Sequence, residues 1–153
     1  MTGTIDARLA ELGIDLPTPA APAANYVPFV QTGNQLFVSG QLPMNADGLQ
    51  FVGKLGAEIS VEDGQAAAKL CAINLLAQAN AATGNLDKVR LVKLVGFVNS
   101  VADFTEQPKV VNGASDFMVE VLGDKGRHAR SAVSAGSLPF GVAVEIEAIF
   151  EIE

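Results

Sequence analysis

Cysteine and histidine are nearly absent from this sequence. Its 153 residues include one cysteine, Cys71, and one histidine, His128. A single cysteine forms no intrachain disulfide, and these two residues are too few for a cysteine or histidine metal cage. Cys71 lies in an apolar helical segment, and we interpret it as core filling rather than as a nucleophile. With one histidine, we assign no Ser-His-Asp catalytic set. We interpret His128 as a surface or interface residue, and as a minor candidate for adjusting the properties of a pocket near Arg130.

Positive charge and long apolar runs are scarce as well. Ten Lys and Arg stand against 17 Asp and Glu, which gives a net charge of −7. This balance argues against a broad nucleic-acid footprint and gives no attraction to anionic membranes. Lys69, Asn74 and Gln78 interrupt the longest apolar stretch, which excludes a membrane span there, and the first residues lack the pattern of a signal peptide. We therefore expect a cytoplasmic protein without nucleic-acid or membrane partners.

Aromatic residues make up 6% of the chain and tryptophan is missing, so the core must be built from aliphatic side chains. A chain of this length folds as one domain that buries roughly two-thirds of its unfolded surface. Charged residues are only 18% and hydrophobic residues 49%. Such a composition indicates that some apolar surface is covered in an oligomer.

The apolar spacing predicts a short N-terminal helix and two long ones. The first covers 4–12, and a Pro/Ala linker follows over 17–24, so we divide the chain into residues 1–24 and 25–153. Ser60 caps a helix that ends at Gly84, and a second long helix begins near Pro108 and ends at Gly123. The expected buried stripes are Ala66, Leu70, Ile73 and Ala77 in the first long helix, and Val110, Ala114, Phe117 and Val121 in the second.

Strands are predicted on both sides of these helices. A hairpin joins 26–32 to 35–39, a short strand covers 49–52, and the β-branched run 89–98 is typical of a central strand buried on both faces. The alternating run 140–153 predicts a half-buried strand. Pro and Gly in 137–141 favour its pairing as the antiparallel neighbour of 126–133, so that an arginine and a glutamate share a face. The fold class is α+β, a two-layer mixed sheet with two long helices on one face.

Several of these segments resemble the Rid/YjgF family of reactive-intermediate deaminases. The residues that carry the resemblance are Val38-Ser39-Gly40-Gln41-Leu42-Pro43, Ala129-Arg130-Ser131, and Val144-Glu145-Ile146-Glu147-Ala148-Ile149. They occur in the family's order over roughly residues 20–153, which leaves the N-terminal helix outside. The resemblance implies a chorismate-mutase-like fold, a homotrimer with ligand pockets between subunits, hydrolysis of 2-imino acids such as 2-aminoacrylate and 2-iminobutanoate to 2-keto acids and ammonia, and no metal or organic cofactor.

The resemblance also assigns roles to single residues. Arg130 matches the arginine that holds the substrate carboxylate, and Glu145 matches the glutamate that activates water. Planar carboxylates suit two parallel hydrogen bonds from one guanidinium, and a protonated imine needs only an oriented water and a base. The remaining substrate-lining positions are Tyr26, Ser39, Gly40, Phe104, Asn112 and Ala132.

The chain departs from the family archetype in three places. Ala132 stands where the archetype has a cysteine, which is tolerated if the contact there uses the backbone. Segments 47–56 and 123–128 are longer than the family core, and with the N-terminal helix they indicate a divergent subgroup. A non-catalytic trimer that binds a small carboxylate or keto acid is the alternative, and an endoribonuclease is disfavoured by the acidic composition and the single histidine.

Overall fold

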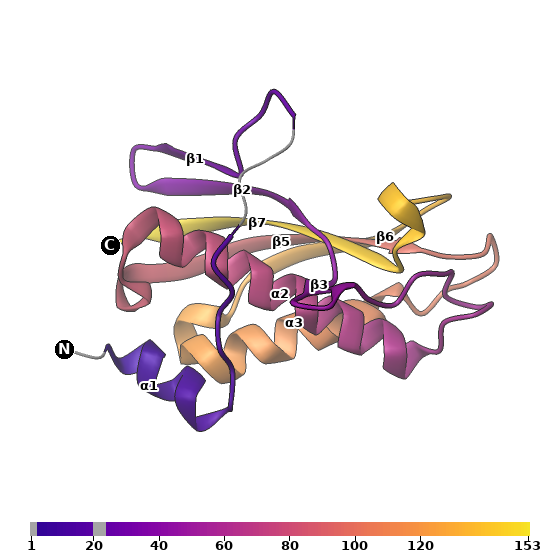
Figure 1. Ribbon diagram of the computed structural model, residues 1–153, viewed down its shortest axis with the longest axis horizontal. Helices are drawn as coiled ribbons and strands as arrows, with labels where there is room; N and C mark the ends of the chain where they lie inside the picture. The colour runs from indigo at the N-terminus through magenta and orange to yellow at the C-terminus, as the bar shows by residue number, and fades with distance from the viewer. Residues whose placement is uncertain (1–2, 20–23) are drawn as a thin grey trace.

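The computed structural model describes residues 3–19 and 24–153, and its helices and strands form two layers (Figure 1). Residues 20–23 of the predicted Pro/Ala linker lie outside the described residues. No described helix is long and apolar enough to cross a membrane. The helices are α1 (Thr4–Glu11), α2 (Val61–Thr83) and α3 (Gln107–Leu122), with 3-10 turns η1 (Leu86–Lys88), η2 (Gly123–Gly126) and η3 (Pro139–Gly141). The strands are β1 (Phe29–Thr32), β2 (Gln35–Gln41), β3 (Met44–Asn45), β4 (Gly48–Leu49), β5 (Val89–Asn99), β6 (Ala129–Ala135) and β7 (Val144–Ile152).

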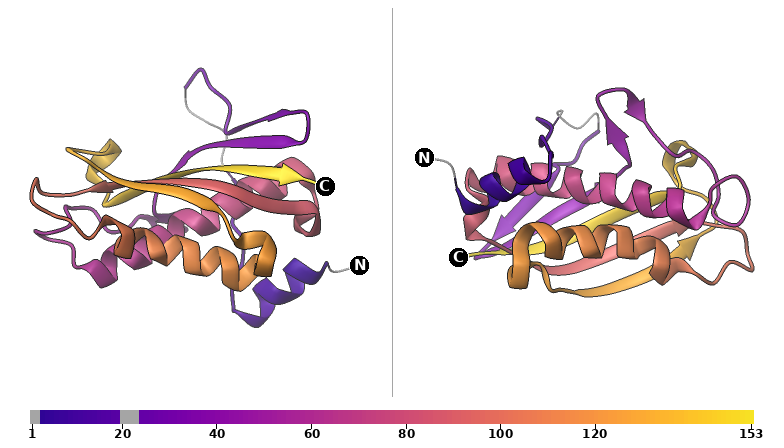
Figure 2. Two further views of the ribbon diagram at one scale, coloured as in Figure 1. Left: turned by 180° about the vertical axis from the view of Figure 1, so that it is seen from behind. Right: turned by 90° about the horizontal axis from the view of Figure 1, so that it is seen from below.

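Five strands form one mixed sheet in the order β1-β2-β7-β5-β6, and β3 and β4 form a separate small ribbon. All neighbours in the main sheet are antiparallel except β5 and β6. Helices α2 and α3 cover one face of this sheet, and no α-helix of the described residues lies on the opposite face (Figure 2). The predicted α+β fold with two long helices on one face is confirmed.

The predicted pairing of the last two strands is wrong. β6 pairs only with β5, in parallel, and β7 pairs with β5 from the other side. The chain leaves β6 and returns around the end of β5, where the backbone of Asn99 bonds to Ala143 and that of Ser100 to Ala135. The Pro and Gly residues near 139–141 therefore form a 3-10 turn in a crossover, not a hairpin. Local turn signals do not show which strand lies between two others.

The ends of α2 follow the predicted capping residues, but its buried face does not follow the predicted stripe. Ser60 accepts a hydrogen bond from the backbone N–H of Asp63 at 3.1 Å, and Gly84 ends the helix in the left-handed conformation. The buried positions are Gly64, Ala67, Ala68, Cys71, Ala72, Leu75, Leu76, Ala77, Gln78 and Ala79, whereas Ala66 is exposed and Leu70 and Ile73 are half-buried. The face of small residues is the one that allows close packing.

Helix α3 is that close neighbour, and its predicted stripe is confirmed. A Cβ at Gly113 of α3 would overlap the backbone of Gln65 in α2, so the two helices touch along their backbones. Val110 and Ala114 are fully buried, and Phe117 and Val121 are 3% exposed. Gly113 thus lets α2 and α3 pack with their backbones in contact.

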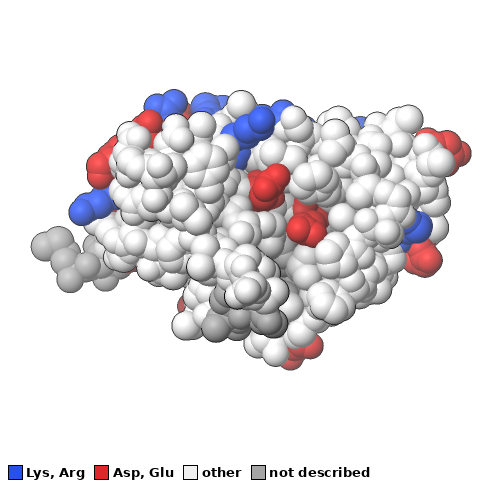
Figure 3. Space-filling model, turned by 90° about the horizontal axis from the view of Figure 1, so that it is seen from above, with Lys and Arg blue, Asp and Glu red and all other residues white. Residues whose placement is uncertain are grey.

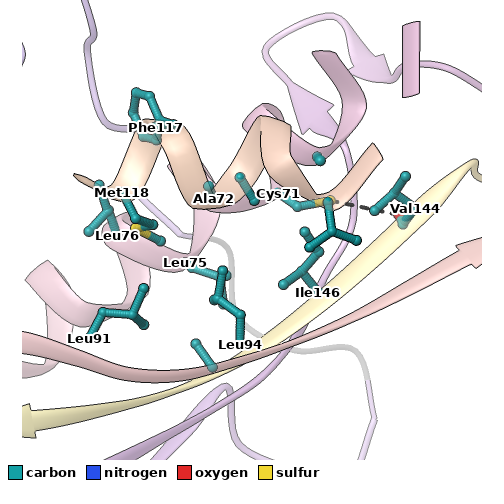
Figure 4. Packing of buried hydrophobic residues seen from close by; sticks show 14 of the residues in the cluster. Cys71, Ala72, Leu75, Leu76, Leu91, Leu94, Phe117, Met118, Val144 and Ile146 are labelled. Atoms are coloured by element: carbon teal, nitrogen blue, oxygen red, sulfur yellow. Dashed lines mark hydrogen bonds between the residues drawn. The ribbon is translucent and has the colours of Figure 1, made fainter. Parts of the chain in front are cut away.

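Cys71 belongs to the core between α2 and the sheet, as predicted (Figure 4). Its thiol lies 3.7 Å from the carbonyl oxygen of Val144, and the side chain is fully buried. Burial, and to a smaller degree the charge of Glu145, raises the pKa of the Cys71 thiol well above its usual range. A thiol held in its protonated form is a poor nucleophile, which agrees with a packing role.

The face of the sheet opposite the helices, which we call the open face, remains accessible in one chain. β5 was predicted to be buried on both sides, but Val92 is 40% exposed there. Phe37 and Val30 on the hairpin and Val133 on β6 are exposed as well. Figure 3 views the molecule from this side: its surface is mainly uncharged, with acidic atoms gathered in a hollow near the middle. The continuous apolar run of β5 therefore indicates that the open face is buried by contact with another molecule.

Helix α1 is attached to the rest of the domain rather than separate from it. The carboxylate of Asp87 accepts hydrogen bonds from the backbone N–H groups of Thr4 at 3.0 Å and Ile5 at 2.8 Å. These bonds lower the pKa of Asp87 and cap the start of α1 from another part of the chain. Leu9 is buried, and the guanidinium Nε of Arg8 donates to the carbonyl of Glu120 in α3.

Candidate active site

Arg130 lies on β6, an edge strand, and its side chain reaches the helix-covered side of the sheet. It pairs in register with Leu94 of β5, which is fully buried. Its Nη1 donates to the hydroxyl of Ser115 at 3.0 Å, and its Nη2 donates to the carbonyl of Pro108 at 3.2 Å. Both acceptors are uncharged and belong to α3. Because a guanidinium has several more N–H donors, these bonds fix its orientation and leave donors for a ligand carboxylate.

Glu145 lies on β7 and faces the open side. It pairs with Phe97 of β5 and is half-buried, and Glu147 is the next residue on the same side. Burial raises the pKa of the Glu145 carboxyl above its ordinary value, and the negative charge of Glu147 raises it further. A carboxylate with a raised pKa binds a proton more readily and is a better general base.

The backbone of β2 lies directly against this carboxylate. The pairing of β2 with β7 is irregular between Val38 and Gln41, and Gly40 lies in that irregular stretch. A Cβ at Gly40 would overlap Oε2 of Glu145, so only glycine leaves the carboxylate in place. The neighbouring Ser39 hydroxyl donates to the carbonyl of Val27 at 3.1 Å, which ties it to the backbone before β1.

Two hollows adjoin these residues. The larger, of about 570 Å³, is lined by the predicted residues Tyr26, Ser39 and Gly40 together with Asn74 and Gln78 of α2. Tyr26 is 57% exposed at its rim. The smaller, of about 380 Å³, lies on the open face, and its lining includes Ser39, Phe37, Lys93 and Glu147. Tyr26, Ser39 and Gly40 thus line one hollow, and Gly40 also lies against the carboxylate of Glu145.

Two of the other predicted residues, Asn112 and Ala132, lie near Arg130, and the third is Phe104. Asn112 is half-buried on α3, one turn after Pro108, whose carbonyl accepts from Arg130. Ala132 follows Arg130 by two residues on β6, pairs with Gly96 and packs against the core. Phe104 is half-buried in the loop between β5 and α3. Asn112 and Ala132 thus adjoin Arg130, whereas Gly40 adjoins Glu145.

The structure does not bring Arg130 and Glu145 together within one chain. β5 separates their strands, and the bonds of Arg130 to α3 place its side chain on the side of the sheet away from Glu145. The prediction that they share a face of two adjacent strands is therefore wrong. A site that uses both residues needs more than one copy of the chain.

One pairing was missed by the sequence analysis. The hydroxyl of Ser115 lies 2.8 Å from Nε2 of His128, and Nδ1 of His128 lies 2.6 Å from the carbonyl oxygen of Gly126. Ser115 follows Pro108 by two helical turns, and His128 precedes Arg130 by two residues, so the spacing of both pairs could have indicated a shared face. Within residues 3–19 and 24–153, no cluster of three or more metal-ligating side chains is found.

Comparison with known proteins assigns the family. Residues 6–150 match the family model described as "YjgF/chorismate mutase-like, putative endoribonuclease". The chain belongs to the YjgF family. Protein TCP17 from Trypanosoma cruzi is 54% identical over 153 residues, which cover 99% of this chain and 96% of that protein.

Solved structures of YjgF-like proteins share this fold. The structure of Atu1372 from Agrobacterium tumefaciens, described as of unknown function, is 53% identical, has a TM-score of 0.91 and aligns with 97% of this chain and 92% of its own. RidA from an Antarctic Psychrobacter is 29% identical, with a TM-score of 0.62 over 88% and 94% of the two chains. Escherichia coli TdcF with bound serine is 25% identical, with a TM-score of 0.64 over 89% and 94%.

Proposed function

We propose that this YjgF-family protein hydrolyses 2-imino acids of the 2-aminoacrylate and 2-iminobutanoate class to 2-keto acids and ammonia, without a metal or organic cofactor. The observation that carries the proposal is that the chain presents two complementary groups. Arg130 is a hydrogen-bonded guanidinium with further N–H donors available, and Glu145 is a carboxylate whose pKa is raised. A substrate with a carboxylate next to a C=N bond needs one group of each kind.

The reaction needs few steps. Arg130 binds the substrate carboxylate, which fixes the C=N carbon relative to Glu145. Glu145 takes a proton from water as the water oxygen attacks the carbon of the protonated imine. The resulting tetrahedral adduct receives that proton on nitrogen. As the C–N bond breaks, Glu145 takes the proton of the remaining hydroxyl group and later releases it to solvent, and ammonia and the keto acid leave. Water supplies the carbonyl oxygen, and no electrons are gained or lost.

The remaining predicted residues line the substrate. Tyr26, Ser39 and Gly40 surround the substrate on the side of Glu145. Phe104, Asn112 and Ala132 do so on the side of Arg130. β6 is an edge strand, so some of its backbone groups near Ala132 point away from the sheet and can hold the imine nitrogen without a cysteine side chain.

The functional unit in this proposal is a homotrimer. Its first support is the separation of Arg130 and Glu145 within one chain. In an oligomer, Arg130 of one copy can lie opposite Glu145 of a neighbouring copy. Its second support is the open face, where Val30, Phe37, Val92 and Val133 are 52%, 42%, 40% and 45% exposed. Apolar side chains gathered on one face are typical of a surface that is covered in the assembly.

The test is keto-acid release from 2-iminobutanoate that a threonine dehydratase generates in the assay. Wild-type protein should accelerate release, and Arg130→Ala should not, while both run as trimers in light scattering. A well-folded wild-type trimer that binds 2-ketobutanoate but accelerates nothing would reject hydrolysis and leave the carboxylate-binding protein. A monomer would reject the shared site.

We propose no nucleic-acid partner, although the family description includes endoribonuclease. The chain carries a net charge of −7, whereas RNA binding gains its affinity from Lys and Arg that neutralise phosphates. RNA cleavage that disappears on further purification, with imine hydrolysis retained, is the expected result. RNA cleavage that is retained in wild type and lost in Arg130→Ala would contradict it.

A further inference from the structure

We propose that Ser115 and His128 are positioning residues for Arg130. A hydrogen-bond relay runs from the guanidinium through the Ser115 hydroxyl and the His128 ring to the carbonyl of Gly126, and it holds the guanidinium in the orientation that receives a carboxylate. This inference rests on the proposed role of Arg130, and it adds two residues that the family resemblance does not assign.

The distances along the relay are those of direct hydrogen bonds. Arg130 Nη1 lies 3.0 Å from Ser115 Oγ, Ser115 Oγ lies 2.8 Å from His128 Nε2, and His128 Nδ1 lies 2.6 Å from the oxygen of Gly126. All three side chains are half-buried. Partial burial strengthens each bond, since less water competes for the same groups.

The chemistry of the end groups fixes the direction of every bond. A carbonyl oxygen only accepts, so the proton of the imidazole ring lies on Nδ1 and faces Gly126. In the neutral ring Nε2 is then an acceptor, and it takes the hydroxyl proton of Ser115. The lone pairs of Ser115 are left for Arg130, which only donates. With His128 neutral and in the Nδ1–H tautomer, every bond of the relay has one donor and one acceptor.

The fold holds both ends of the relay. Gly126 closes η2, and a Cβ there would overlap the backbone of Met118 and Val119, so η2 lies directly on α3. At the other end, Nη2 of Arg130 donates to the carbonyl of Pro108 at 3.2 Å. The guanidinium is thus bound at two points on one helix. Without the relay it keeps one, and a long side chain with one contact samples several rotamers.

The first experiment reads the tautomer directly. Because His128 is the only histidine, the two-bond proton–nitrogen spectrum of the ¹⁵N-labelled full-length protein contains one ring. The relay predicts a protonated Nδ1 and an unprotonated Nε2 at neutral pH. It also predicts that the Nε2 resonance moves in Ser115→Ala and in Arg130→Ala, and returns toward wild type in Ser115→Thr. An Nε2–H tautomer, or an Nε2 resonance that neither variant moves, would overturn the relay.

The second experiment measures calorimetric binding of 2-ketobutanoate, the keto acid produced from 2-iminobutanoate. Ser115→Ala should raise Kd about fivefold to tenfold, Ser115→Thr should restore it to within about twofold, and Ser115→Ala should add nothing in an Arg130→Ala background. In turnover the same variant should raise KM by a similar factor and change kcat by less than about twofold. The matched control is Ser131→Ala, which removes an exposed hydroxyl next to Arg130.

The two experiments separate this inference from the proposed function. Additive effects of Ser115→Ala and Arg130→Ala, or equal effects of Ser115→Ala and Ser131→Ala, would overturn the positioning role. If wild type shows the predicted tautomer and tight keto-acid binding but no imine hydrolysis, the relay is supported and the proposed hydrolysis is rejected. If wild type binds no keto acid, the proposed hydrolysis is rejected. The relay is then tested only by the spectra of Ser115→Ala and Arg130→Ala.

Discussion

The two faces of the sheet place their candidate functional residues in different surroundings. On the helix-covered face, Arg130 is hydrogen-bonded to α3 within its own chain. On the open face, burial and a neighbouring carboxylate raise the pKa of Glu145, and the surface around it is apolar and exposed. The first face is covered by helices of the same chain, whereas the second is open in one chain and is covered by another copy in the proposed trimer. This difference explains how one domain can carry both halves of a site without bringing them together.

The largest expected effect is on the open face, at Glu145. Glu145→Gln keeps the shape of the side chain but removes the base, so kcat for imine hydrolysis should fall by roughly 10²–10⁴-fold. Binding of 2-ketobutanoate should remain within about threefold of wild type, because Arg130 is untouched. Stopped-flow keto-acid release and calorimetry measure the two quantities. A Glu145→Gln variant with wild-type kcat would remove Glu145 from the mechanism.

A large effect of another kind is expected on the helix-covered face, at Leu94. Leu94 is fully buried, whereas its neighbour Val95 is half-buried and lines the hollow on the open face. Leu94→Ala should lower the free energy of unfolding by about 2–5 kcal/mol, through lost burial and the cavity left behind. Val95→Ala is the matched variant. In urea melts at equal protein concentration, it should cost less; an equal cost would show that both faces are packed alike.

Gly40→Ala should act on activity more than on stability. Its Cβ would displace the carboxylate of Glu145, while Gly40 itself is exposed. A misplaced base lowers kcat, here by about tenfold to 100-fold. The control is Gly136→Ala, where a Cβ meets nothing within 4 Å. Equal kcat for the two variants would contradict the contact between β2 and Glu145.

The smallest expected effect is a shift in pH dependence. Glu145 acts as a base only when ionised, so kcat should fall on acidification as the pH passes through its raised pKa. Glu147→Gln removes the neighbouring negative charge, which lowers the pKa of Glu145. The acidic limb of the pH–rate profile should therefore move to lower pH. A limb that moves to higher pH, or stays in place, would assign it to another group.

Apolar periodicity and capping residues predicted where helices and strands lie in the sequence, but predicted less well which elements pack or pair with one another. Ser60 and Gly84 marked the ends of α2, and the stripe from Val110 to Val121 marked the buried face of α3. The α2 stripe was right at Ala77 and wrong at Ala66, Leu70 and Ile73, because the packing of α3 and the sheet buries a neighbouring face of the helix. The place of β6 beside β5 was also missed, since a parallel pair joined through a helix leaves no local turn signal.

The candidate site shows the same limit. The resemblance pointed to Arg130 and Glu145 as single positions, but their separation follows from the strand order, which local pattern does not contain. Ser115 and His128 were overlooked as a pair because they meet only once α3 and η2 pack together. Each side chain alone has an ordinary role on a helix or at a strand end. Only tertiary packing gives them a common partner in Arg130.

The central claim is that the site combines Arg130 of one copy with Glu145 of another. Its most direct test mixes Arg130→Ala and Glu145→Gln, each inactive alone, by unfolding and refolding them together in equal amounts. Random assembly of trimers places an intact arginine opposite an intact glutamate in about one quarter of the sites, so about one quarter of wild-type activity should return. A mixture that remains inactive, although mass spectrometry shows mixed trimers, would place both residues in one chain's site and contradict the account.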